Sequence, residues 1–118
     1  NFNCFISTST PTEEIPLRLS ECKVLFNHIR YEEVNIRFFE ALAVGVQVCT
    51  HTPALSLFAD LGRDYLTFRT PEECISKIQY LLDHDEVREE MDRSAQQTAL
   101  RHTYENRLRT MLHFLNLL

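Results

Sequence analysis

The sequence predicts an α/β fold in which a parallel sheet is flanked by helices. Short runs rich in β-branched and aromatic residues at residues 23–27, 46–50 and 65–68 are typical of strands. Longer segments with apolar residues at helical spacing alternate with these runs. Strands that alternate with helices imply βαβ crossovers, which make the strands parallel and place helices on both faces of the sheet.

The expected helix starts are threonine–proline pairs at residues 10–11, 52–53 and 70–71. In the first and third of these, glutamates follow at the positions of a capping box, so we expect the threonine to cap the helix and the proline to occupy its first turn. The pair at 52–53 lacks the glutamate and predicts a short helix. Residues 2–6 are a candidate for one further strand.

From about residue 71 to residue 118 the pattern is entirely helical. Asp85 is a candidate cap for the second helix of this part. Each of the three expected helices carries an apolar stripe. The stripes are Cys74, Ile75, Ile78, Leu81 and Leu82; then Val87, Met91, Ala95 and Ala99; and finally Tyr104, Leu108, Met111, Leu115 and Leu118.

The last stripe, which begins at Tyr104, has alternating steps of four and three residues, a heptad-like spacing. Packing against the domain's own sheet or helices is the simpler interpretation. The alternative is a seam for another domain or for a second copy of the chain.

Composition indicates one soluble globular domain spanning residues 1–118, with 44% hydrophobic and 25% charged residues. A net charge of -5 disfavours nucleic acid or an anionic membrane as the main partner. No apolar run approaches the roughly 20 residues of a transmembrane helix. The chain begins at Asn1 rather than methionine, so we expect a trimmed or partial N-terminus.

Cys4, Cys22, Cys49 and Cys74 form no Cys-x-x-Cys pair, and the five histidines are dispersed, so we assign no metal site. Buried free thiols in a reducing compartment are expected, which favours a cytoplasmic location. With only two glycines the chain has no glycine-rich phosphate loop. We therefore do not expect an autonomous nucleotide-binding enzyme of the Walker or dinucleotide-binding type.

The candidate site lies where the strand at residues 23–27 leads into the helix that ends at Val44. The connecting loop is at the carboxyl end of a parallel strand, where open α/β sheets bind ligands and where the next helix directs its free N–H groups. Asn35 is the candidate N-cap of this helix, Arg37 lies in its first turn, and Glu40 follows one turn later.

Each of these residues has two interpretations. Asn35 either caps the helix only or also contacts a ligand. Arg37 either pairs with Glu33 four residues earlier or binds an anion at the helix start. Glu40 is either a solvated carboxylate at the rim of an apolar face or a ligand-binding group. The second interpretation follows if the residue is buried, because burial of a carboxylate without partners is costly.

Glu32 and Glu40, separated by seven residues, resemble the glutamate pair of retaining GT-B glycosyltransferases. More narrowly, residues 34–45 (VNIRFFEALAVG) resemble a segment of the spore-maturation-protein-like branch of the group 1 transferases. The similarity continues at Thr50 and at residues 52–55, 57–58, 62–64, 70–73 and 102–107.

The resemblance implies a Rossmann-like, nucleotide-sugar-binding domain and a role for each candidate residue. Glu40 is expected to bind the ribose hydroxyls, and Glu32, as the catalytic candidate, to approach the donor sugar. Backbone amides at the helix start, with Asn35 and Arg37, are expected to hold the diphosphate. The nucleotide-diphosphate-sugar enters as a substrate, not a cofactor.

The chain departs from the family pattern in several ways, among them the residues after the first glutamate, Val44 in place of the usual cysteine, and the length. Glu33 and Val34 replace the glycines usual after the first glutamate. The match also covers only the last part of the donor-binding domain, so complete catalysis by these 118 residues alone is not expected. The stripe of Tyr104, Leu108, Met111 and Leu115 is therefore expected to contact an acceptor domain or a second copy in a homodimer. The alternative to a donor-binding function is a non-catalytic α/β interaction module.

Overall fold

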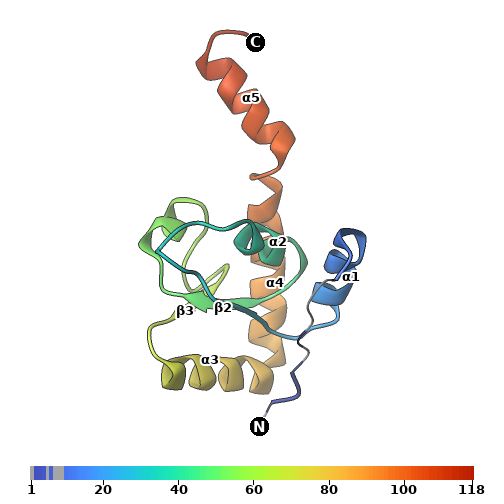
Figure 1. Cartoon of the computed structure of the whole chain (residues 1–118), viewed down its shortest axis with the longest axis vertical. Coiled ribbons are helices and arrows are strands. Elements are labelled where there is room, and N and C mark those ends of the chain that lie inside the picture. Colours follow the sequence, from blue (N-terminus) through green and yellow to red (C-terminus); the bar gives the residue numbers. More distant parts are fainter. Residues whose placement is uncertain (1, 5, 7–9) are drawn as a thin grey trace.

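A computed structural model describes residues 2–4, 6 and 10–118 (Figure 1). Two short 3-10 helices, η1 and η2, accompany five α-helices and three strands in this part of the chain. The order is η1 (Thr12–Glu14), α1 (Ile15–Ser20), β1 (Leu25–Asn27), α2 (Ile36–Val44), β2 (Gln47–Thr50), η2 (Pro53–Leu57), β3 (Leu66–Phe68), α3 (Pro71–Asp83), α4 (Asp85–Leu100) and α5 (Tyr104–Phe114).

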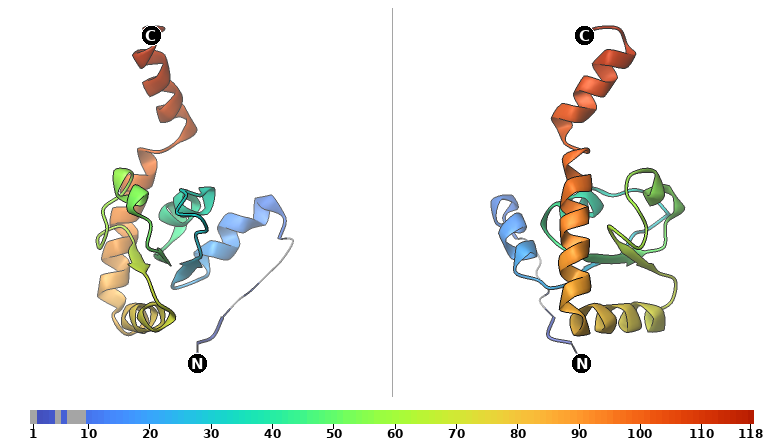
Figure 2. Two further views of the ribbon diagram at one scale, coloured as in Figure 1. Left: turned by 60° about the vertical axis from the view of Figure 1, so that its left-hand side comes forward. Right: turned by 180° about the vertical axis from the view of Figure 1, so that it is seen from behind.

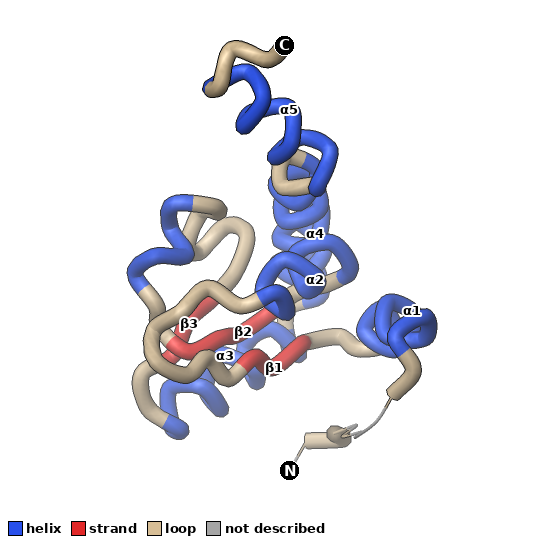
Figure 3. The backbone as a smooth tube through the Cα atoms, turned by 45° about the horizontal axis from the view of Figure 1, so that its top comes forward, coloured by secondary structure: helices blue, strands red, loops and turns tan. Residues whose placement is uncertain are grey.

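The three strands form a parallel sheet in the order β1-β2-β3, which confirms the predicted α/β fold. In the register Phe26 lies opposite Val48, and Val48 opposite Leu66. All three strands therefore end at the same edge of the sheet, so the loops that follow them are neighbours (Figure 3).

Helices cover both faces of the sheet, and alternate residues of β2 show how. Cys49 belongs to a buried cluster with Phe38 and Leu42 of α2. Val48, on the opposite face, packs in a second cluster with Leu81 of α3. Helix α4 contributes buried residues to both clusters and so connects the packing on the two faces of the sheet (Figure 2).

The cap of α3 is confirmed: the Thr70 hydroxyl accepts from the Glu73 backbone N–H at 3.1 Å. The cap expected at Thr10 is wrong, because α1 begins only at Ile15. Pro16 has no N–H to donate to an earlier turn, so the segment breaks into η1 and a new helix with proline in its first turn.

The Asp85 cap is also wrong. His84 is the N-cap of α4, and Asp85 is its first helical residue, with a carboxylate 2.6 Å from Arg88 Nη2. The short helix expected after Thr52 is present as η2, although the Thr52 hydroxyl donates to the Thr50 carbonyl instead of capping it.

The further strand expected in residues 2–6 includes residue 5, which lies outside the described residues; residues 2–4 and 6 are in no strand.

Two of the four cysteines depart from the expectation of buried thiols. Cys49 and Cys74 are buried, whereas Cys4 is exposed and Cys22 is half-buried; all four are free. Among the described residues, no helix has the length and apolar character needed to cross a membrane.

Candidate functional site at the carboxyl edge of the sheet

Asn35 caps helix α2, as predicted. Its side-chain oxygen accepts from the Phe38 backbone N–H at 3.0 Å. The same amide exchanges two hydrogen bonds with Asn27 at the end of β1, at 3.2 and 3.3 Å. Buried Gln47 of β2 extends this network by donating to the Phe38 carbonyl at 2.9 Å. The start of α2 is thus fixed to the ends of two strands.

The loop before α2 contains two consecutive residues in the left-handed region, Tyr31 (φ 57°) and Glu32 (φ 53°). For residues with a side chain this conformation costs roughly 1–2 kcal/mol each. Both side chains are exposed. Unusual backbone of this kind is concentrated at ligand-binding loops, and here it falls on the first glutamate of the pair.

Arg37 is exposed in the first turn of α2, and no ion pair with Glu33 is present among the described residues. In the same described part of the chain, the side chains of Glu32, Arg37 and Glu40 have no hydrogen-bonding or ion-pair partner. The backbone N–H groups of Ile36 and Arg37 also lack a hydrogen bond there. The helix start therefore has donors free to bind an anion.

Glu40 is half-buried, and its surroundings correct part of the sequence argument. The face that it shares with Ile36 and Ala43 is open to solvent, with Ile36 61% exposed. The buried face of α2 consists of Phe38, Ala41 and Leu42 instead. Glu40 is therefore not deeply buried, and the cost of burying a carboxylate does not argue for a ligand at this position.

Three basic side chains that the sequence reasoning did not assign lie at this edge. His28, His51 and Arg69 are each the first residue after a strand, following β1, β2 and β3 in that order. Because the strands are parallel, their ends adjoin. The position of each residue directly after a predicted strand is the signal that could have found them.

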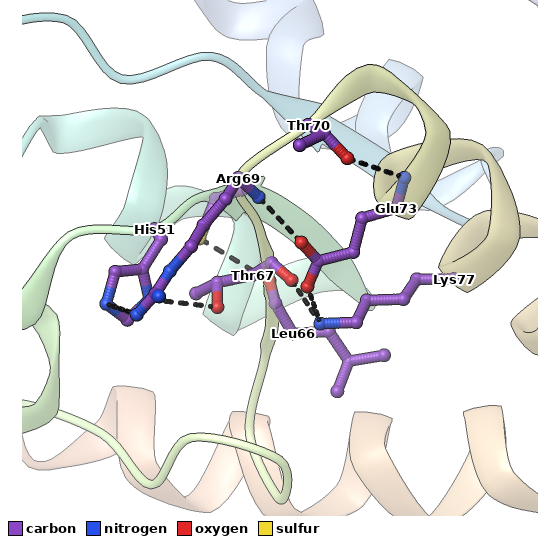
Figure 4. Close-up of polar contacts among 8 residues, drawn as sticks. His51, Leu66, Thr67, Arg69, Thr70, Glu73 and Lys77 are labelled. Atoms are coloured by element: carbon purple, nitrogen blue, oxygen red, sulfur yellow. Dashed lines mark hydrogen bonds and ion pairs between the residues drawn. The ribbon is translucent and has the colours of Figure 1, made fainter.

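His51 and Arg69 contact each other across the ends of β2 and β3 (Figure 4). Arg69 Nη2 lies 3.1 Å from His51 Nε2, and His51 Nδ1 lies 3.3 Å from the Thr67 hydroxyl. A guanidinium only donates, so Nε2 accepts, and the imidazole is neutral with its proton on Nδ1. Arg69 thus has a neutral partner rather than a carboxylate at its side chain.

Glu73 supports the backbone of this loop. Its carboxylate accepts from Lys77 at 2.8 Å and from the Arg69 backbone N–H at 3.0 Å. These hydrogen bonds, that from Lys77 first, lower the pKa of the exposed Glu73 carboxyl. Lys77 also donates to the Thr67 carbonyl at 2.5 Å, so α3 holds the segment that carries Arg69 in place (Figure 4).

Two open grooves lie elsewhere. One of about 560 Å³ runs between η2 and α5, lined by Leu57, Phe58, Arg107, Met111 and Phe114 among others. The other, of about 380 Å³, is polar and includes Arg63 and Arg101. The residues named as lining these two grooves do not include Glu32, Asn35, Arg37 or Glu40.

A family model described as glycosyl transferase-like matches residues 3–113. The chain belongs to this family. The match contains the whole unit from β1 through α2, including both glutamates. Comparison with curated proteins and with solved structures gives no significant match.

Proposed function

We propose that this chain forms the donor-binding part of a retaining glycosyltransferase that uses a nucleotide-diphosphate-sugar. The family match over residues 3–113 carries the proposal, because it spans the strand, loop and helix on which Glu32 and Glu40 lie. The finer assignment to the GT-B group and to its spore-maturation-protein-like branch is part of the proposal.

In this proposal Glu40 accepts hydrogen bonds from the ribose hydroxyls, and Glu32 approaches the donor sugar. The free N–H groups of Ile36 and Arg37, with the Arg37 guanidinium, hold the diphosphate. Asn35 contributes mainly by fixing the helix start, since its oxygen already accepts from Phe38. Fixed positive groups near the phosphates stabilise a diphosphate leaving group, which is the main electrostatic need of such a reaction.

Thermal unfolding in the presence of UDP, GDP and their sugars tests the proposal. A nucleotide at 100 times its Kd stabilises the folded state by about 2.7 kcal/mol, which raises Tm by roughly 10 °C for a domain of this size. Glu40→Ala should reduce this shift, whereas Glu33→Ala, an exposed carboxylate in the same loop, should not. If no nucleotide raises Tm, donor binding by this chain is rejected.

A second candidate is a non-catalytic module that self-associates through α5. The observation that favours it is the apolar stripe of α5, in which Tyr104, Leu108, Met111 and Leu115 are 83%, 51%, 50% and 53% exposed. The simpler expectation, burial of this stripe against the domain's own sheet or helices, is wrong, because no residue of α5 is buried. Light scattering at micromolar concentration tests the self-association: a dimeric mass that Leu108→Glu converts to a monomer supports it, and a monomeric wild type removes it.

A further inference from the structure

Helix α5 projects from one end of the molecule, and none of its residues is buried (Figures 1 and 2). Its attachment therefore depends on few contacts. Thr103 caps it by accepting from the Asn106 backbone N–H at 3.1 Å, and Asn106 Nδ2 donates to the Leu100 carbonyl at 2.7 Å. These contacts are local to residues 100–106. His102 and Arg107 make hydrogen-bond and ring contacts that reach the body of the domain.

Arg107 lies over two aromatic rings from different parts of the chain. Its guanidinium carbon is 5.1 Å from the centre of the Phe39 ring in α2 and 5.4 Å from that of Phe58, which follows η2. The two rings contact each other edge to face, with centres 5.6 Å apart. The distances of 5.1 and 5.4 Å from the guanidinium carbon to the two ring centres are within the range of a cation–π interaction.

His102 completes this cluster and orients the guanidinium. Its Nε2 lies 2.6 Å from the Phe58 carbonyl, and its Nδ1 lies 3.3 Å from Arg107 Nη2. A carbonyl only accepts, so Nε2 carries the proton, and Nδ1 accepts from the arginine. The imidazole is also 5.4 Å from the Phe39 ring. We call His102, Arg107, Phe39 and Phe58 the latch cluster.

The latch cluster connects the start of α5 to the residue next to Glu40. Phe39 packs edge to face on buried Phe38, whose backbone is held by Asn35 and Gln47. We propose that Arg107 is a positioning residue: through Phe39 it fixes the turn of α2 that presents Glu40, and so couples the position of α5 to the donor site. The part of this inference that concerns donor affinity rests on the proposed function.

Coupling of this kind is reciprocal for binding. A partner that moves α5 changes the affinity of the α2 site for nucleotide, and nucleotide changes the affinity for the partner by the same factor. The proposed coupling also gives a role to the segment at residues 102–107, His-Thr-Tyr-Glu-Asn-Arg. In this segment His102, Thr103 and Arg107 each make at least one of the contacts described above.

The chain provides a matched control in Arg109. This residue is on the same helix, but its guanidinium pairs with Glu105 at 3.1 Å on the exposed surface. The variants to compare are Arg107→Gln, which removes the cation, Arg107→Lys, which keeps a cation over the rings, and Arg109→Gln. The two readouts are backbone amide hydrogen exchange and the affinity for whichever of UDP and GDP stabilises the wild type.

Arg107→Gln should speed exchange in α2 around Phe39 and Glu40 several-fold and leave α3 unchanged, whereas Arg109→Gln should change neither. Nucleotide affinity should fall about fivefold in Arg107→Gln, less in Arg107→Lys, and less than about twofold in Arg109→Gln.

Equal exchange in α2 for the Arg107→Gln and Arg109→Gln variants, or an equal increase in α2 and α3, overturns the positioning role. Faster exchange in α2 with unchanged affinity overturns the coupling to the donor site. If the wild type binds neither nucleotide, the proposed function fails, and the exchange data alone decide whether Arg107 positions α2.

Discussion

Asp64 gives the sharpest stability prediction, because its carboxylate is almost completely buried and accepts three hydrogen bonds. The side chain is 1% exposed. It accepts from the Ser94 hydroxyl at 2.5 Å, from the Thr98 hydroxyl at 2.8 Å and from the Asp60 backbone N–H at 2.9 Å. It therefore joins the loop between η2 and β3 to helix α4.

Replacing Asp64 by alanine leaves these donors without their acceptor. Breaking a buried charged network by removing one partner costs about 3–5 kcal/mol. Asparagine keeps the shape and one acceptor but turns an amide nitrogen towards a donor, so we expect about 1–2 kcal/mol for Asp64→Asn. The total stability of a domain this size is about 5–15 kcal/mol, so the alanine variant should be severely weakened.

The same network predicts a pH dependence. Burial raises the pKa of the Asp64 carboxyl, but the hydrogen bonds from Asp60, Ser94 and Thr98 and the charge of Arg63 outweigh it, so the pKa lies below its ordinary value. A carboxyl with a lowered pKa in the folded state stabilises the fold above its unfolded pKa of about 3.9. That contribution is lost as the pH falls through the folded pKa.

Urea unfolding followed by circular dichroism measures both effects. At pH 7 the order of stability should be wild type, Asp64→Asn, then Asp64→Ala, and the gap between wild type and Asp64→Asn should narrow below about pH 4. Asp83→Asn, which changes an exposed carboxylate, is the control. If Asp64→Asn and Asp64→Ala both unfold within about 0.5 kcal/mol of the wild type, or the gap is constant with pH, the reasoning is wrong.

Two further predictions concern the site helix and the central strand. Asn35→Ala should lower the free energy of unfolding by about 2 kcal/mol, because it removes the cap of α2 and the partner of Asn27. Asn35→Asp keeps the acceptor and should lose only about half as much. Equal urea midpoints for the two variants would contradict this. Burial raises the pKa of the Cys49 thiol to about 12, so iodoacetamide at pH 8 should label exposed Cys4 and spare Cys49 until the chain unfolds. If Cys4 and Cys49 are labelled at the same rate in the native protein, Cys49 of β2 is accessible to the reagent and the prediction is wrong.

The strand and helix order was predictable because local signals agree with the packing. The caps Asn35 and Thr70 form where their spacing indicates, and the apolar stripes of α3 and α4 supply the buried residues Leu81 and Met91. The prediction failed at the first helix, where Pro16 competes with a good capping sequence at Thr10. A local sequence pattern does not show which of two competing helix starts will form.

At the candidate site, the cap of α2 was predictable from the sequence, but other contacts at this edge of the sheet were not. Asn35 followed from capping chemistry, whereas the contact of His51 with Arg69 depends on the pairing of β2 with β3. The place of Arg107 over Phe39 joins residues 68 positions apart, and no periodicity encodes such a contact. These long-range contacts require the fold before they can be recognised.

The central claim is that Glu40 binds the ribose of a nucleotide donor, and a binding cycle tests it most directly. Calorimetry would measure the affinity of wild type and Glu40→Gln for a nucleoside diphosphate and for its 2′,3′-dideoxy analogue. Hydrogen bonds to a charged group are worth about 1.5–3 kcal/mol, so removing either the carboxylate or the hydroxyls should weaken binding roughly 10- to 100-fold. Removing both should weaken it little further, because the same interaction is lost. If the two losses simply multiply, or if Glu40→Gln binds as tightly as the wild type, Glu40 does not hold the ribose.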